Sequence, residues 1–368
     1  MLSWAWKNLW SEPGGTVAAV VAVASAVLLA LVMQAVFVGE SEQIVRYLER
    51  SDAEVWVMQS GTSNMHMASS LVPESRVEDI SEVSGVHDQT AILYMNAFVE
   101  LGELRLFSYV VGVPADAPRG GAWRVAEGSS MPAPGGAVVP EGAALRAGLE
   151  LGDEVRIADR AFTIVGLSRE TRSMANTLVF VELEDLQELM SASTAVSYVL
   201  VTLEPGADPQ AVAASIVDQV PNVNALTTPA FVESDYAMAM EMGVDLIRIM
   251  TLVGTLLGAL MIGFTAWSST VRRSREYAIA KALGASTPAL FVVVTAQTLA
   301  MALMGFSLAA AGALLGEPLL ARLLPEVALS VAAADLARMA GLVVLVSMPA
   351  AWLTARRIAR LDPVEAFH

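Results

Sequence analysis

The chain has 368 residues, of which 55% are hydrophobic and only 16% are charged, and its formal net charge is −16. Soluble domains average about a quarter charged residues, so this composition excludes an ordinary soluble domain. Cysteine is absent, which excludes disulfides and thiolate metal sites. The apolar residues gather in long uncharged runs, which is typical of a membrane protein.

The first 15 residues are expected to form an interfacial helix on the cytoplasmic side. They contain tryptophans at positions 4, 6 and 10, and tryptophan favours the membrane–water boundary. Pro13 is expected to end this helix. Residues 16–38 carry no charge and predict the first transmembrane helix. The alternative is a cleaved signal peptide, but the apolar core of such a peptide has about 7 to 15 residues behind a basic segment, and here only Lys7 is basic ahead of the run.

Residues 39–240 predict a mixed α/β extracytoplasmic domain, with an element order that suits two α/β subdomains. They hold 29 acidic and 11 basic side chains, which indicates either a cationic partner or a solvated, self-repelling surface. The Pro/Gly-rich stretch 114–136 is interpreted as a joint or surface loop. Strands are expected at 54–58, 91–101, 105–113, 137–140, 154–157, 161–167, 178–181 and 198–203, and helices at 73–83, 141–147, 183–190, 208–220 and 227–248.

The rest of the chain predicts three more transmembrane helices, at 241–271, 288–316 and 336–355. A cytoplasmic coupling helix (272–287) and an outer loop (317–335) join them, and a cytoplasmic tail (356–368) follows. Arginines cluster in the 272–287 loop and the tail, and short basic loops face the cytoplasm. We therefore expect a multi-pass α-helical protein of the cell (inner) membrane with both termini cytoplasmic. Its four transmembrane helices are arranged as one plus three, with the α/β domain inserted between the first and the second.

The loop at 272–287 has the features of a short helix with defined ends. It is expected to begin near Arg275 and to end at Gly284, where a positive φ suits glycine. Ser286 or Thr287 can cap the next helix. The alternative interpretation is that this basic loop only obeys the positive-inside rule. Two edges of the short helix are distinguished by their spacing: Glu276, Ile279 and Leu283 form one, and Tyr277 and Lys281 form the other.

Several motifs in order resemble the MacB/LolE/FtsX-like permeases of ABC transporters. The first is the string from Arg275 to Ala285, Arg-Glu-Tyr-Ala-Ile-Ala-Lys-Ala-Leu-Gly-Ala. The second is Asp-Pro-Val-Glu-Ala at 362–366, and the third is a strand-rich segment at 149–167. Residues 54–58 are similar to the DevC branch. The chain departs from the family pattern in three places. Ala278 stands where the family often has glycine, and Gln297 lies near the position of a usual glutamate. Just before the first span, residues 12–15 (Glu-Pro-Gly-Gly) stand where basic residues are common.

The resemblance implies a mechanotransmission permease. Two permease chains, identical or different, are expected to pair above a dimer of ABC ATPase subunits, which bind ATP and Mg. A periplasmic adaptor or a lipoprotein is a further candidate partner. This chain is expected to bind no cofactor or metal itself and, given its acidic exterior, no nucleic acid. The ATPase-coupling residues implied are Arg275, Glu276, Tyr277, Ile279, Lys281, Leu283 and Gly284.

The residues also exclude some activities without the resemblance. No Gly-x-x-x-x-Gly-Lys-Ser/Thr string occurs, so the chain is not a P-loop ATPase and any ATP energy comes from a partner. No catalytic constellation is evident, and we expect no enzyme. The string Met65-His66-Met67 would suit copper(I), but no second such cluster follows, so we predict no metal site.

Small residues at four-residue spacing allow close helix approach, either between two chains or within one. The candidates for a dimer interface are Ala18, Ala22, Ala26, Gly254 and Gly258. Two functions follow from these observations. The first is a permease that moves its outer domain to export or extract a substrate. The alternative is an FtsX-like signalling scaffold that activates an extracytoplasmic cell-wall hydrolase without transport.

Overall fold

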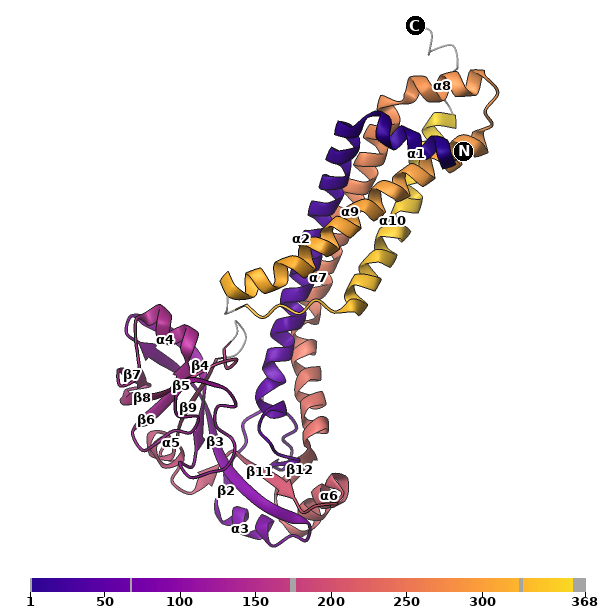
Figure 1. Cartoon of the computed structure of the whole chain (residues 1–368). Helices are drawn as coiled ribbons and strands as arrows, with labels where there is room; N and C mark the ends of the chain where they lie inside the picture. Colours follow the sequence, from indigo (N-terminus) through magenta and orange to yellow (C-terminus); the bar gives the residue numbers. More distant parts are fainter. Residues whose placement is uncertain (1, 67, 173–176, 324–326, 360–368) are drawn as a thin grey trace. The chain divides into compact units, whose positions relative to one another are not determined.

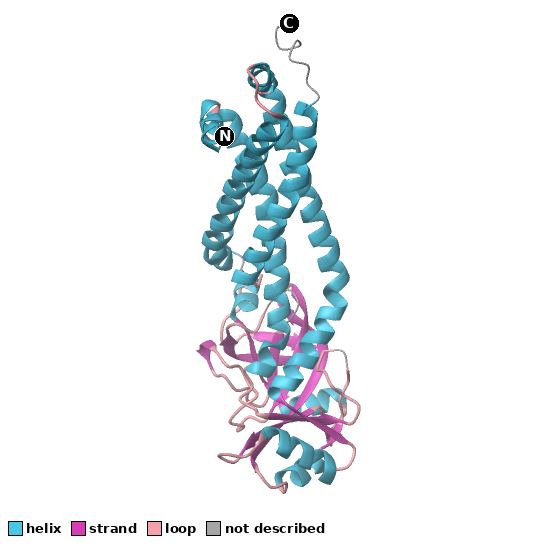
Figure 2. Ribbon diagram, turned by 90° about the vertical axis from the view of Figure 1, so that its right-hand side faces the viewer, coloured by secondary structure: helices cyan, strands magenta, loops and turns pink. Residues whose placement is uncertain are grey.

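The computed structural model describes residues 2–66, 68–172, 177–323 and 327–359. The chain divides into two compact units. The helical unit contains Met1–Gly39, Val244–Leu323 and Leu329–His368, and the α/β unit contains Glu40–Gly243 and Leu324–Ala328. Figures 1 and 2 show the strands of the described residues within the α/β unit. Four of the described helices are long and apolar enough to cross a membrane, with the α/β unit inserted between the first and the second, which confirms the predicted fold class.

The helical unit is built from long apolar helices and two short ones, of which the first is amphipathic. Pro13 begins the second helix and so separates it from the first, as proline at a first helical position does. The ninth helix reaches Leu323 and takes in the first part of the expected outer loop. The helices are α1 (Leu2–Ser11), α2 (Pro13–Glu49), α7 (Thr228–Arg272), α8 (Ser274–Ala282), α9 (Thr287–Leu323) and α10 (Ala333–Ala359).

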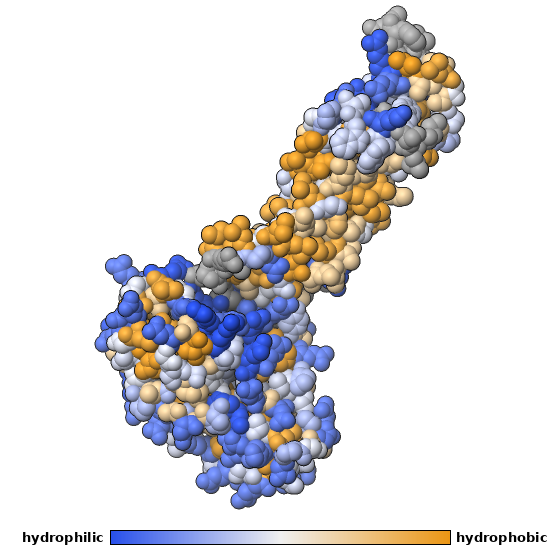
Figure 3. Space-filling view, viewed as in Figure 1, coloured by the Kyte–Doolittle hydropathy of each residue, from blue (hydrophilic) through white to orange (hydrophobic). Residues whose placement is uncertain are grey.

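The core of this unit is made where α2, α7, α9 and α10 meet. Gly305 of α9 is required there, because a Cβ at that position would lie 2.7 Å from Val23 Cγ1 of α2. Outside the core, large apolar side chains such as Leu260 and Leu345 are exposed, and Figure 3 shows this apolar surface in orange. An apolar exterior around an apolar core is what a helix bundle in lipid requires.

The α/β unit is organised around one ten-stranded sheet with the order β12-β1-β11-β3-β4-β9-β6-β8-β5, in which β7 pairs with β3 and β8. A second, two-stranded sheet joins β10 and β2. The strands are β1 (Val55–Gln59), β2 (Val72–Pro73), β3 (Val86–Leu101), β4 (Leu104–Val113), β5 (Val125–Gly128), β6 (Gly136–Pro140), β7 (Glu154–Ile157), β8 (Arg160–Ser168), β9 (Leu178–Glu182), β10 (Ala195–Val196), β11 (Tyr198–Leu203) and β12 (Val223–Thr227). The helices are α3 (Ser75–Ser81), α4 (Glu141–Ala147), α5 (Leu183–Met190) and α6 (Pro209–Gln219).

The long strand β3 joins two α/β halves. Residues 86–92 pair with β11, and residues 93–101 pair with β4. One half buries residues of α3 and α6 in its core, and the other buries residues of α4 and α5. The expected subdomains are therefore linked by a shared strand. The stretch 114–136 contains β5, which has only four residues and pairs with β8 at the sheet edge, so it is too short to show an alternating strand pattern in the sequence.

Candidate functional site

The short helix α8 has sharply defined ends. It follows α7 after one residue, Arg273, whose φ of −104° and ψ of 10° interrupt the helical backbone. It closes at Gly284, where φ is +95°, as predicted. Gly284 N–H donates to the Lys281 carbonyl at 3.0 Å, and Ala285 N–H donates to the Ala280 carbonyl at 3.0 Å, which is the bonding of a glycine C-cap. These ends make α8 a rigid element instead of a flexible connection.

One face of α8 is anchored in the helical unit. Tyr277 is only 1% exposed, and its hydroxyl donates to Gln297 Oε1 of α9 at 2.7 Å. Burial raises the pKa of Tyr277 to about 12, so the hydroxyl remains a donor at neutral pH. Trp4 of α1 packs edge-on against the Tyr277 ring, with centroids 6.0 Å apart. The predicted coupling residue Tyr277 therefore holds α8 in place and is not available at the surface.

The opposite face of α8 is open. Arg275 and Glu276 are exposed, Ile279 is 42% exposed and Leu283 is 85% exposed. Leu283 has the largest exposed fraction among the large apolar side chains of the part of the chain that the structure describes. An exposed apolar side chain beside charged side chains, on a helix that is fixed in place, is typical of a protein-docking surface. Lys281 is half-buried, and Gly284 lies exposed at the closing turn.

The far ends of α2 and α7 enter the core of the α/β unit. Tyr47 near the end of α2 is 1% exposed, and Phe231 near the start of α7 is completely buried. Trp56 of β1 packs against both, with ring centroids 6.0 Å from Tyr47 and 5.4 Å from Phe231. The Tyr47 hydroxyl also donates to the Gly120 carbonyl at 2.8 Å. These contacts place the last residues of α2 and the first residues of α7 within one close-packed aromatic core.

A buried carboxylate fastens α7 to a neighbouring loop. Asp235 of α7 has a side chain with no exposure, and its Oδ2 lies 2.6 Å from His66 Nδ1. Its Oδ1 accepts from the backbone N–H groups of Met65 at 2.9 Å and His66 at 3.3 Å. We name these three residues the Asp235 clamp. The His66 ring, considered above for copper, is thus engaged with a carboxylate, while Met67 lies outside the described residues.

Sequence reasoning missed this clamp. Its two side chains are 169 positions apart, and no local pattern in a single sequence connects them. The side chains at 242–248, where α7 passes from one unit to the other, also lie outside the described residues.

The residues proposed for a dimer interface differ in exposure and in what they contact. Ala18 is exposed, while Ala22 and Ala26 are half-buried. A Cβ on Gly254 would lie 3.0 Å from Ala30 Cβ of α2, so Gly254 serves close packing within the chain. A Cβ on Gly258 would meet nothing within 4 Å. Ala18, Ala22 and exposed side chains of α7 line one open hollow of about 620 Å³. The surface formed there by α2 and α7 is therefore accessible to the same two helices of a second chain.

Two family models match the chain. The MacB-like periplasmic core domain matches residues 16–219, and the FtsX-like permease C-terminal domain matches residues 248–363. An uncharacterized ABC transporter permease of Mycobacterium bovis is 22% identical over 353 residues, which cover 95% of each chain. A second such permease, of Mycobacterium tuberculosis, is 25% identical over 316 residues, which cover 85% of this chain and 84% of the relative.

Two solved structures are similar to the α/β part. The periplasmic region of MacB from Actinobacillus actinomycetemcomitans has a TM-score of 0.40 at 10% identity, covering 52% of this chain and 96% of that chain. The extracellular domain of the noncanonic ABC-type transporter YknZ from Gram-positive bacteria has a TM-score of 0.37 at 12% identity, covering 47% of this chain and 98% of that chain.

Proposed function

Because the chain belongs to the MacB/FtsX-type family of ABC transporter permeases, we propose that it works as a mechanical transmission. In this proposal a separate ABC ATPase dimer docks on α8 at the cytoplasmic face, and its ATP-driven closure moves α8. The movement reaches the α/β unit outside the membrane and drives export or extraction of a substrate. The chain itself binds no nucleotide.

The observation that carries this proposal is the pair of shared helices. The helix α2 places Val23 and Val27 in the core of the helical unit and Tyr47 in the core of the α/β unit. Likewise, α7 contributes Ile262 to the first core and Phe231 to the second. Each helix therefore contributes residues to both hydrophobic cores, which supports the proposed transmission.

The docking surface is the open face of α8. Leu283 and Ile279 supply the apolar contact, and Arg275 and Glu276 flank it with charges that select a partner. Two copies of the chain would place two such faces beneath the membrane, one for each ATPase subunit. The two copies would contact each other through the surface of α2 that carries Ala18. Movement of a substrate is the function that we propose, and activation of a cell-wall hydrolase without transport is the alternative; the chain matches both a MacB-like and an FtsX-like family model.

The proposal is tested by replacing Leu283 with alanine. Because Leu283 is 85% exposed, the change is expected to alter stability by no more than about 0.5 kcal/mol. As an interface anchor it is expected to weaken ATPase binding by about 2 kcal/mol, or roughly thirtyfold in Kd. The measurement is the affinity of the cognate ATPase subunit for the reconstituted chain, together with the stimulation of its ATPase rate.

The matched control is Leu315→Ala on α9, a leucine that is 77% exposed and expected to face lipid. It should leave ATPase affinity unchanged. The variant Glu276→Ala is expected to weaken binding to a smaller extent, by removing a flanking charge. Unaltered ATPase affinity in both α8 variants would show that the ATPase does not use this helix.

A further inference from the structure

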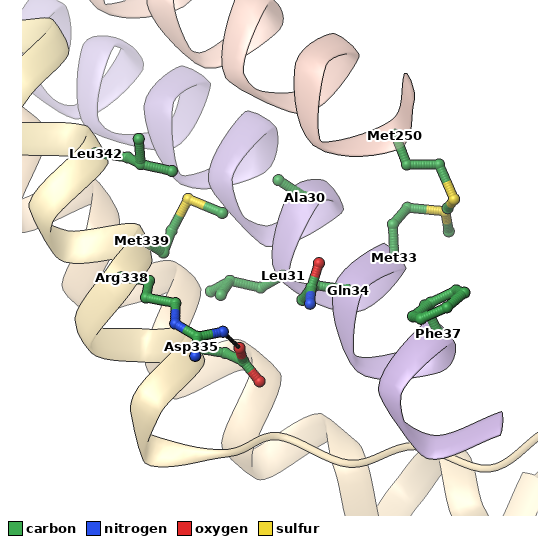
Figure 4. A pocket seen from close by; sticks show the side chains of 10 residues that line it. All are labelled: Ala30, Leu31, Met33, Gln34, Phe37, Met250, Asp335, Arg338, Met339 and Leu342. Atoms are coloured by element: carbon green, nitrogen blue, oxygen red, sulfur yellow. Dashed lines mark hydrogen bonds and ion pairs between the residues drawn. The ribbon is translucent and has the colours of Figure 1, made fainter. Parts of the chain in front are cut away.

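A cavity of about 210 Å³ lies within the helical unit between α2, α7 and α10. Its walls are mainly apolar and include Met33 of α2 and Met339 and Leu342 of α10. Three polar side chains also line it: Gln34, Asp335 and Arg338. Figure 4 shows these residues on α2 and α10, with Met250 of α7 beside Met33. None of them takes part in the docking face or in the Asp235 clamp.

On the α10 wall of the cavity the polar side chains precede the apolar ones, whereas on α2 the polar Gln34 lies between Met33 and Phe37. On α10, Asp335 and Arg338 come before Met339 and Leu342, and a rise of 1.5 Å per residue separates Asp335 from Leu342 by about 10 Å along the helix axis. In Figure 4, Gln34 lies at the end of the Asp335–Arg338 pair, and Leu342 lies at the other end. The α10 wall of the cavity is therefore amphipathic along the helix axis, with its charged pair at the end where Gln34 lies.

The charged end can accept an anionic group. Arg338 Nη1 lies 3.3 Å from Asp335 Oδ1, and the Arg338 side chain is 76% exposed whereas that of Asp335 is 13% exposed. A guanidinium has five N–H donors, so the pair leaves several of them directed to the surroundings. Asp335 holds the Arg338 side chain at the cavity mouth, and the remaining donors suit the oxygens of a phosphodiester.

The size of the cavity limits what it holds. Drug-sized sites measure about 300–1,000 Å³, and at about 30 Å³ for each water-sized group this cavity has room for about seven such groups. That is part of one acyl chain and not a whole lipid. The walls belong to membrane-spanning helices, so the hydrocarbon of the bilayer is the available occupant.

We propose that this cavity binds a membrane glycerophospholipid, with its phosphodiester on Arg338 and the upper part of one acyl chain between Met33, Met339 and Leu342. The lipid comes from the leaflet opposite α8. That leaflet is the outer one when α8 faces the cytoplasm, so the choice of leaflet rests on the proposed function. Because α2 forms one wall, the bound lipid contacts one of the two helices that both cores share. The site thus makes the transmission sensitive to the lipid around it.

The test uses the full-length chain in phosphatidylcholine vesicles that contain a phosphatidylcholine probe with a diazirine in its acyl chain. After illumination, mass spectrometry of peptides is expected to find label on residues 30–37 and 335–342. Replacing Leu342 with tryptophan fills the cavity and is expected to reduce this labelling at least fivefold. The matched control is Leu345→Trp, a position on α10 that is 68% exposed and does not line the cavity, and it should leave the labelling unchanged.

The role of the head group is tested separately. Arg338→Gln is expected to reduce labelling by the phosphatidylcholine probe about tenfold, because a charge-assisted hydrogen bond is lost. Labelling by a diacylglycerol with the same diazirine chain should not change. An equal loss with both probes would contradict phosphodiester recognition. If Leu342→Trp lowers the thermal stability of the chain, Met33→Trp fills the cavity from the α2 wall instead.

Label found outside both segments, or label that Leu342→Trp does not reduce, would overturn the proposal. Disulfide crosslinks between two chains through a cysteine placed at Met33 or Leu342 would assign the cavity to a second copy and would also overturn it. The ATPase affinity of Leu283→Ala is measured on separate samples. If Leu283→Ala leaves the ATPase affinity unchanged while the lipid labelling is as expected, the proposed function is refuted and the lipid site is retained.

Discussion

Replacing Asp235 with leucine removes the acceptor of three hydrogen bonds at once and puts a larger, apolar side chain in the same buried place. The Asp235 side chain has no solvent exposure, so the Met65 and His66 N–H groups would lose their partner inside the α/β unit. Disrupting a buried, hydrogen-bonded pair costs about 3–5 kcal/mol. For a domain of 150–250 residues each kcal/mol lowers Tm by about 2–4 °C, so we expect a decrease of roughly 6–20 °C.

The assay is thermal unfolding of the purified chain followed by tryptophan fluorescence, to which the buried Trp56 of the same core contributes. His66→Ala is expected to show a smaller decrease, since both backbone N–H groups keep their acceptor. The matched control is Glu233→Leu, two residues away on α7 and exposed, which should change stability by no more than about 0.5 kcal/mol. An Asp235→Leu variant within about 1 kcal/mol of the unmodified chain, or a Glu233→Leu variant equally destabilised, would refute the reasoning.

Two further predictions concern the helical unit. Gly284→Val is expected to lower the stability of the chain by about 1–2 kcal/mol, because φ is +95° at this position, and to reduce ATPase stimulation by misplacing α8. The control is Gly316→Val, where a Cβ meets open space. Equal thermal stability and equal ATPase stimulation in the two variants would argue against a structural role of the turn at Gly284. Since the chain has no native cysteine, Ala18→Cys is expected to crosslink two chains under oxidation. Ala24→Cys, at a position that is only 6% exposed and does not line the hollow, is not. A gel that shows no crosslinked dimer for Ala18→Cys, or as much for Ala24→Cys, would contradict the interface.

The elements that could be predicted are those whose signals are local. Uncharged runs marked the membrane helices because hydrocarbon tolerates no unpaired charge along such a length. Gly284 marked the end of α8 because the residue after a helix often adopts a positive φ, which glycine adopts without strain. The strand β12 was missed, because Val223–Thr227 leads directly into a long helix with no turn residue between them.

The sequence by itself determined the membrane class, the inserted α/β domain and the short helix between the second and third membrane spans, because apolar runs, period and turn residues each act within a few positions. Only the tertiary structure decided which face of α8 is open and that Tyr277 is its anchor, since burial depends on what α1 and α9 place against it. The pairing of His66 with Asp235 and the burial of Tyr47 and Phe231 around Trp56 were decided there too. Contacts between residues more than 100 positions apart come from packing, and packing has no period along the chain.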